Sequence, residues 1–210
     1  MHFPILTSAF TLLSLSLALC TTAQNVSTNA PVVTDNEPVS VHHASLLAKD
    51  NTTVYGGITI TSRLSSPALA VDVYIGGIPE GQYLNYHIHR APVPADGNCY
   101  STGAHLDPYN RTQKPPCNST APNTCEVGDL SGKHGVVWAP AGEVFRASYS
   151  EFFLANTPGA EAYFGDLSWV VHAPNNDRLT CGNFEVAVPA GGAGDYDEDE
   201  VDEVVAEGRA

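Results

Sequence analysis

The chain has 210 residues, of which 43% are hydrophobic and 15% charged, so it is long and apolar enough for one folded core. It carries 9 basic and 23 acidic residues, a formal net charge of −14, and no basic patch, which argues against nucleic-acid binding. Eight of the 23 acidic residues lie after residue 194, so the net charge reflects the end of the chain more than its centre.

The first 23 residues predict a secretory signal peptide. An apolar run at 10–19 is followed by small residues up to Ala23, where a signal peptidase cleaves. The run is too short to span a bilayer. We therefore expect a secreted protein, either extracellular or associated with the cell wall, from which Cys20 has been removed.

The next segment and the end of the chain lack the periodicity of folded elements. Residues 24–50 are rich in Ser, Thr, Asn, Val and Pro, which predicts a flexible leader; we interpret its pair His42 and His43 as solvated, with copper capture as the alternative. Residues 190–210 predict a disordered acidic tail. Since no apolar segment follows the tail, we expect neither a GPI anchor nor a membrane span.

Residues 51–189 predict a single all-β domain without an amphipathic helix. Short runs with strand patterns, separated by Gly and Pro, indicate strands at 54–62, 68–75, 83–90, 135–138, 144–150, 168–172 and 183–188. The connection over 91–133 is unusually long for a compact domain. Because such loops are usually functional or disordered and this one holds three cysteines, we expect it to be ordered and functional.

The strand predicted at 83–90 carries two histidines on one face. Side chains alternate along a strand, so His87 and His89 share a face, while Leu84, Tyr86 and Ile88 share the other. Two imidazoles on a rigid strand lose little entropy when they bind a metal, and neutral imidazole binds Cu, Zn, Fe or Ni. Taken alone, the pair is weak evidence for a metal site and favours two surface histidines on a solvated strand.

The mature chain retains four cysteines, which predict two disulfides in an oxidising compartment: Cys99, Cys117, Cys125 and Cys181. The sequence alone allows three pairings. Four Asn-x-Ser/Thr sequons predict N-glycosylation of an extracellular protein, at Asn25, Asn51, Asn110 and Asn118.

Five short motifs, taken in order, resemble the signatures of copper/zinc superoxide dismutases over about 54–188; they lie at 86–89, 97–108, 127–130, 170–172 and 178–182. The resemblance implies a Greek-key β-sandwich or flattened barrel of about eight antiparallel strands with long functional loops. It also implies conversion of superoxide to dioxygen and hydrogen peroxide through a Cu(II)/Cu(I) cycle. Two other families with a His-x-His pair match this sequence less well. A cupin needs a Glu a few residues after the pair, where this chain has Ala-Pro-Val-Pro at 91–94, and carbonic anhydrases lack the motifs around Cys99, Arg178 and Cys181.

The resemblance assigns roles residue by residue. One copper ion per chain would be bound by His87, His89, His105 and His172. Arg178 would guide the superoxide anion, and a surface ion pair with Asp177 is the alternative for this side chain. The resemblance further implies that Cys99 pairs with Cys181, which leaves Cys117 for Cys125.

The chain departs from the family where zinc is usually bound. No histidine lies between His105 and Asp129, Glu126 stands three residues before that aspartate, and the charged loop after His172 is missing. Both losses resemble the secreted copper-only superoxide dismutases of fungi, so we expect no zinc. In that subgroup Glu126 would hydrogen-bond His105 and take part in catalysis; otherwise it is a solvated loop carboxylate. His134 leaves open an improvised zinc site with these three residues.

Two other functions remain open at this point. The chain could be an extracellular copper-buffering protein of the same fold with little activity, or a wall or adhesion protein that uses the fold as a scaffold. Retention of Arg178 beside all four histidines favours the enzyme, because storage of a metal needs no guide for an anion. The resemblance to copper-only relatives implies a monomer.

Overall fold

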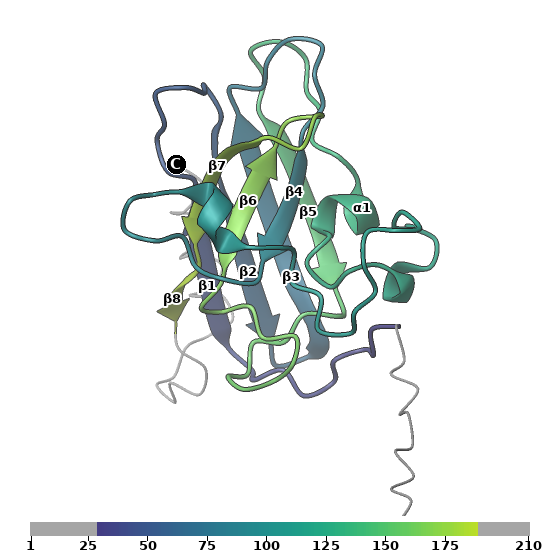
Figure 1. Ribbon diagram of the computed structural model, residues 1–210. Helices are drawn as coiled ribbons and strands as arrows, with labels where there is room; N and C mark the ends of the chain where they lie inside the picture. Colours follow the sequence, from purple (N-terminus) through teal and green to yellow (C-terminus); the bar gives the residue numbers. More distant parts are fainter. Residues whose placement is uncertain (1–28, 189–210) are drawn as a thin grey trace, which may run out of the picture.

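Two antiparallel β-sheets face each other in the computed structural model, which describes residues 29–188 (Figure 1). The larger sheet has the strand order β5-β3-β2-β1-β8, with the bounds Phe145–Glu151, Ser66–Gly76, Tyr55–Arg63, Ser40–Ser45 and Glu185–Val188. The smaller sheet has the order β4-β6-β7, with the bounds Asn85–His89, Ser168–His172 and Arg178–Asn183. The expected sandwich of eight antiparallel strands is confirmed, and the described strands do not close into a barrel.

The core lies between the two sheets and is built from the apolar faces of the strands. Ile58 and Ile60 of β2 are buried, and they belong to the same hydrophobic cluster as Tyr86, Ile88 and Trp169 of the smaller sheet. Each such side chain contributes about 1.5–3 kcal/mol when it is fully buried. The predicted apolar face of β4 is therefore confirmed, and His87 and His89 point away from this core.

The first strand lies in a segment that we predicted to be flexible, so this prediction was wrong for Ser40–Ser45. We expected a flexible leader up to residue 50, but Ser40–Ser45 pairs with both β2 and β8. Its polar residues are buried through specific contacts rather than solvated: Ser40 Oγ hydrogen-bonds Ser62 Oγ at 2.9 Å, and the His42 ring packs against Phe164. His43 bonds the hydroxyls of Thr59 and Ser45, so both of its ring nitrogens have partners. His42 is 3% exposed, so the pair is not solvated as we expected.

Two further elements differ from the prediction. Residues 135–138 form no strand, since only Val137 pairs there, with Leu84, after the helix ends at Gly135. Strand β7, which begins at Arg178, was missed because its residues show no apolar alternation. The strands predicted at 54–62, 68–75, 83–90, 144–150, 168–172 and 183–188 correspond to β2, β3, β4, β5, β6 and β8.

The long connection between β4 and β5 is ordered, as predicted. It contains the short 3-10 helices η1 and η2, Cys99–Thr102 and Pro122–Thr124, and one turn of α-helix, α1, Leu130–His134. Figure 1 shows α1 beside β5 and β4. None of the helices in the described part of the chain is long and apolar enough to cross a bilayer.

Some expectations fall outside the described residues. The predicted signal peptide, the sequon at Asn25 and the acidic tail all lie there. The other three sequon asparagines, Asn51, Asn110 and Asn118, are exposed, so their glycosylation stays a prediction that the structure permits.

Candidate metal centre

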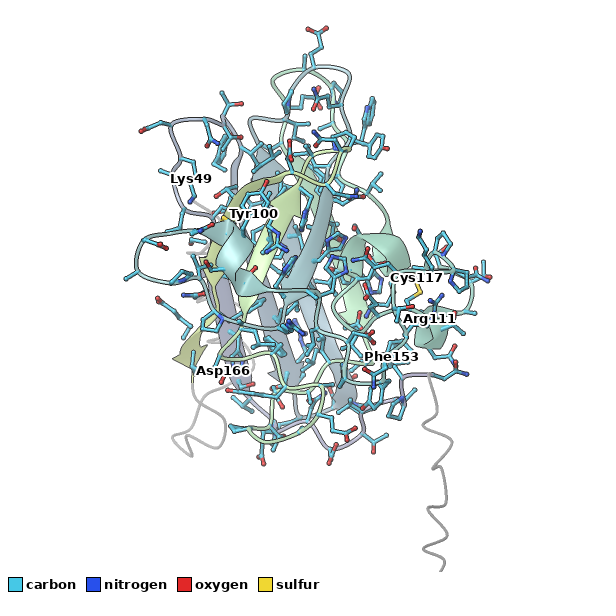
Figure 2. All side chains as sticks on the ribbon, viewed as in Figure 1. Lys49, Tyr100, Arg111, Cys117, Phe153 and Asp166 are labelled. Atoms are coloured by element: carbon cyan, nitrogen blue, oxygen red, sulfur yellow. A yellow bond between two sulfur atoms is a disulfide. The ribbon has the colours of Figure 1, made fainter. Side chains whose placement is uncertain are left out.

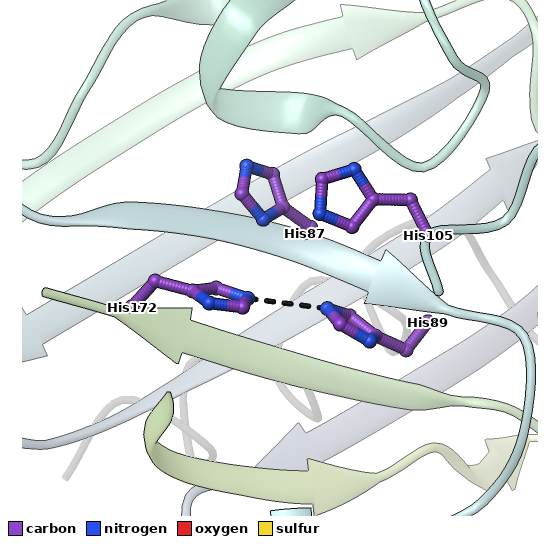
Figure 3. A group of neighbouring side chains, drawn as sticks. All are labelled: His87, His89, His105 and His172. Carbon is purple, nitrogen blue, oxygen red and sulfur yellow. Dashed lines mark hydrogen bonds between the residues drawn. The ribbon is translucent and has the colours of Figure 1, made fainter. Parts of the chain in front are cut away.

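Four histidines from three separate segments converge on one point. His87 and His89 lie on β4, His172 ends β6, and His105 comes from the long loop; Figure 3 shows the four rings facing one another. One ring nitrogen from each residue lies within 4.8 Å of all the others. The ligand set expected from the sequence is therefore brought together. His87 and His89 are only 7% and 1% exposed, which contradicts the alternative of two solvated surface histidines.

The free edge of β4 positions the loop histidine. Strand β4 pairs with β6 on one side, which places His172 opposite Asn85. On its other side, Ile88 N donates to Gly128 O and Leu106 N donates to Ile88 O, so the loop extends the sheet. A Cβ atom on Gly128 would lie 2.2 Å from Ile88 O, so only glycine allows this approach. The resulting ladder fixes His105 beside His89.

Each of the four rings uses one nitrogen for a protein contact. Nδ1 of His89 faces Gly103 O at 3.0 Å, and Nδ1 of His172 faces Asn176 O at 3.3 Å. Nδ1 of His105 bonds Glu126 Oε2 at 2.5 Å. These contacts fix the tautomers and leave the three Nε2 atoms as acceptors.

His87 is oriented the other way. Its Nε2 lies 3.2 Å from Ser131 Oγ and 3.4 Å from Asp129 Oδ1, whereas its buried Nδ1 has no hydrogen-bond partner among the described residues. A buried nitrogen without a partner is costly unless it binds something else. The set facing inward is thus Nδ1 of His87 and Nε2 of His89, His105 and His172.

This donor set fits one copper ion. The Nε2 atoms of His89 and His172 are 3.1 Å apart, close to the separation of about 2.9 Å that neighbouring ligands have when each metal–nitrogen bond is about 2.0 Å. Burial, and then the neighbouring histidines, lower the pKa of His87 well below its usual value and that of His89 to about 2. These two rings are therefore neutral near pH 7, which is the form that binds metal. Four imidazoles suit Cu(II).

Arg178 lies beside the centre, because its Nη2 and Nδ1 of His89 share the carbonyl of Gly103. Its Nη1 donates to Cys99 O at 2.7 Å and to Thr102 Oγ1 at 3.0 Å, and its Nη2 donates to Gly103 O at 2.6 Å. The expected alternative was a surface ion pair with Asp177, yet that carboxylate accepts from Asn175 Nδ2 instead. The guanidinium is thus held by the loop that carries His105.

The sequence pattern of copper/zinc superoxide dismutases matches residues 54–196 of the chain. The chain belongs to this family. A cell surface Cu-only superoxide dismutase of Arthroderma benhamiae is 33% identical over 87% of the chain, and cell surface Cu-only superoxide dismutase 5 of Candida albicans is 35% identical over 74%. The chain spans 55% and 65% of the lengths of these two relatives.

A solved structure of the same Candida albicans superoxide dismutase 5, described as Cu(II), is also similar. It has a TM-score of 0.64 and 30% sequence identity, and the match covers 76% of this chain and 99% of that one. Fold and sequence therefore agree on the superoxide dismutase family.

The region where this family usually binds zinc is built differently here. Glu126 is only 7% exposed and bonds His105, so it is not the solvated carboxylate of the alternative interpretation. Asp129 accepts from Gly132 N at 2.8 Å, caps α1 and faces His87; its burial raises its pKa. His134 Nε2 instead bonds Glu151 Oε2 at 2.8 Å, and its ring stacks on Tyr149. The improvised zinc set therefore does not assemble.

Two disulfides join the pairs that the family resemblance implied. Cys99 is bonded to Cys181, which ties the loop of His105 to β7, and Cys117 is bonded to Cys125, directly before Glu126. A cavity of about 280 Å³ lies between this second disulfide and His105, and Glu126 also lines it. Solvent therefore has a route to the His105–Glu126 pair.

Sequence reasoning missed three residues that support the centre. Ser131 contacts His87, and Lys133 binds the carbonyl of Val127; both lie in the motif after Asp129, which was the available signal. Nothing in the sequence pattern pointed to a supporting role for Arg111. Its side chain donates to the carbonyls of Thr124, Thr112 and Pro116 and so braces the loop near Cys117, where Figure 2 labels both residues.

Proposed function

We propose that the protein is a secreted, copper-dependent superoxide dismutase of the cell surface or wall that works without zinc. The observation that carries this proposal is the convergence of His87, His89, His105 and His172 beside Arg178. The relatives named above are cell surface Cu-only superoxide dismutases, which supports the location and the metal.

Copper in this site would supply one-electron chemistry, by which one superoxide is oxidised to dioxygen and a second is reduced to hydrogen peroxide. Arg178 would bind the anion. Within the described chain, its three hydrogen bonds use three of the five N–H groups of a guanidinium, so two remain for superoxide. Because those three bonds fix its position, little entropy is lost when the anion binds.

Glu126 would orient His105 and manage a proton. The carboxylate holds Nδ1 of the ring, which keeps Nε2 directed toward the metal position and raises its basicity. The same pair can hold a proton at Nδ1 and exchange it with solvent in the adjoining cavity. Formation of hydrogen peroxide from superoxide consumes protons, so such a relay serves the second half of the cycle.

We further propose that the protein acts as a monomer. All four ligand histidines, Arg178 and Glu126 belong to one chain, so the centre is complete without a partner subunit. Light scattering coupled to gel filtration of the secreted protein tests this, and a dimeric mass would contradict it.

One experiment tests the function. The purified protein is reconstituted with copper alone, and superoxide removal and metal content are measured on the same sample. We expect one copper per chain, no zinc and rapid dismutation. In the control variant His87→Gln/His89→Gln, copper binding and dismutation should both be lost. One bound copper without dismutation would support a buffering protein instead, and stoichiometric zinc would contradict the copper-only proposal.

A further inference from the structure

A buried ion pair joins α1 to β5 next to the turn that carries Glu126. Lys133 of α1 and Glu151 at the end of β5 have side chains that are 1% and 0% exposed, and Lys133 Nζ lies 2.7 Å from Glu151 Oε2. His134 Nε2 donates to the same oxygen at 2.8 Å, and Glu151 Oε1 accepts from Phe153 N at 2.9 Å. The charges are therefore fully paired, and the carboxylate is held from three sides.

The pair reaches the backbone of the site through Lys133. Its Nζ also donates to Val127 O at 2.9 Å, so the side chain folds back on the turn that leads into its own helix. Val127 follows Glu126 and precedes Asp129, whose N–H donates to Glu126 O at 3.0 Å to close the turn. The ammonium thus ties this turn to Glu151 at the end of β5.

The same turn and helix support two of the four histidines. Glu126 bonds His105, while Asp129 and Ser131 face Nε2 of His87. A shift of the turn or of α1 would displace all three contacts together. Gly128 ties this turn to β4 and the loop of His105, and Lys133 ties it to Glu151 of β5, so the geometry of the three contacts depends on both attachments.

Stability alone does not account for this pair. Removing two charges from water is costly, and a buried ion pair can often be replaced by apolar side chains of similar volume without loss of stability. An apolar pair would fill the space between α1 and β5, but it could not bind Val127 O. The hydrogen bond to this carbonyl is what the charged pair adds.

We propose that Lys133 and Glu151 are positioning residues, which anchor the turn 126–129 and α1 so that Glu126 meets His105 while Asp129 and Ser131 meet His87. The inference rests on the copper site of the proposed function but not on dismutation. According to this proposal, the Lys133–Glu151 pair affects the bound metal although neither side chain contacts the metal.

The test is the double variant Lys133→Met/Glu151→Leu of the copper-loaded protein, which removes both charges and keeps the volume. We measure its thermal unfolding, the Cu(II) electron paramagnetic resonance spectrum and the rate of copper release to a chelator. We expect some loss of stability, because Val127 O and Phe153 N lose their buried partners. We also expect an altered spectrum and release of copper about tenfold faster, since loss of groups that orient metal ligands typically weakens metal binding about 10–100-fold.

A matched control removes a buried polar network far from the histidines. Asn156 is 3% exposed and bonds Glu37 and Ser40, so Asn156→Leu should lower stability and leave the copper spectrum and release rate unchanged. Equal acceleration of release in this control would overturn the proposal, because the effect would then follow general stability.

Glu151→Gln provides a second, nearly isosteric variant, which keeps the proposal testable if the double variant fails to fold. We expect a several-fold faster release of copper from it. If the parent binds copper and both folded variants have the same spectrum and release rate as the parent, this inference alone is overturned. A parent that binds no copper would overturn it together with the proposed function.

Discussion

Replacement of Glu126 by glutamine tests how His105 is controlled in the absence of a second metal. The carboxylate contacts His105 Nδ1 at 2.5 Å, and the two side chains are only 8% and 10% exposed. A hydrogen bond to a charged group contributes about 1.5–3 kcal/mol, and a neutral one about half of that. Glutamine keeps an acceptor oxygen but loses the charge, so the hold on His105 should weaken by about 1 kcal/mol.

A loss of about 1 kcal/mol corresponds to roughly a fivefold change in rate. We therefore expect copper-loaded Glu126→Gln to turn over superoxide about fivefold more slowly than the parent. The deficit should grow as the pH rises, because solvent supplies fewer protons and an amide cannot relay them. Stopped-flow measurement of superoxide decay from mildly acidic to mildly alkaline pH gives both the rate and its pH dependence.

The control for this variant is Glu161→Gln. Glu161 lines the neighbouring cavity with His105 and Glu126 but is itself exposed, so its charge is lost without a change at the histidine. Both variants should retain one copper per chain. The reasoning is refuted if Glu126→Gln keeps the rate and the pH profile of the parent at equal copper content.

Arg178→Met should lower kcat/KM about tenfold or more at unchanged copper content, since a charged hydrogen bond to the anion of about 1.5–3 kcal/mol is lost; an unchanged kcat/KM would exclude the guiding role. The Cys99–Cys181 disulfide closes a loop of 82 residues. Its replacement by two serines should lower the free energy of unfolding, measured by urea denaturation, by about 4 kcal/mol. A loss below about 1 kcal/mol would contradict the chain-entropy model. Burial alone would raise the pKa of Glu151, but the charge of Lys133 and the hydrogen bonds from His134 and Lys133 lower it to about 2. Since this pKa lies below the ordinary value of 4.5, the pair stabilises the fold above that pH, and on the order of 3 kcal/mol is lost as the pH falls from about 4.5 to 2. Urea denaturation at several acidic pH values should show this loss in the parent and not in Glu151→Gln, and equal acid sensitivity of the two would argue against it.

The strands that could be predicted are those with alternating apolar residues. Ile58 and Ile60 marked β2, and Leu84, Tyr86 and Ile88 marked the region of β4. Strand β1 could not be found in this way, because its buried residues include Ser40 and His42. Their burial depends on a hydroxyl from β2 and a ring of Phe164, partners that only the tertiary structure supplies.

The candidate site was predictable in its residues and not in its detailed geometry. The motifs gave the four histidines and Glu126, whereas the nitrogen that each ring turns inward depends on contacts such as Gly103 O and Asn176 O. His134 illustrates the limit. Its place in the sequence suggested the zinc region, but its partner is Glu151, which lies 17 residues further along the chain at the end of β5.

Hydrogen bonds fill the region of this chain where the family usually binds zinc. In this chain, the region where the family usually binds zinc is formed by the surroundings of Nδ1 of His105 and by Asp129. Here Glu126 occupies that nitrogen, and Asp129 is committed to Gly132 N and His87, so a zinc ion would have to break these contacts to bind. Hydrogen bonds are weaker and less rigid than metal coordination, so the turn that makes them needs its own anchor. Lys133 and Glu151 lie where such an anchor is required, which connects a buried charge pair in the scaffold to the chemistry of the metal centre.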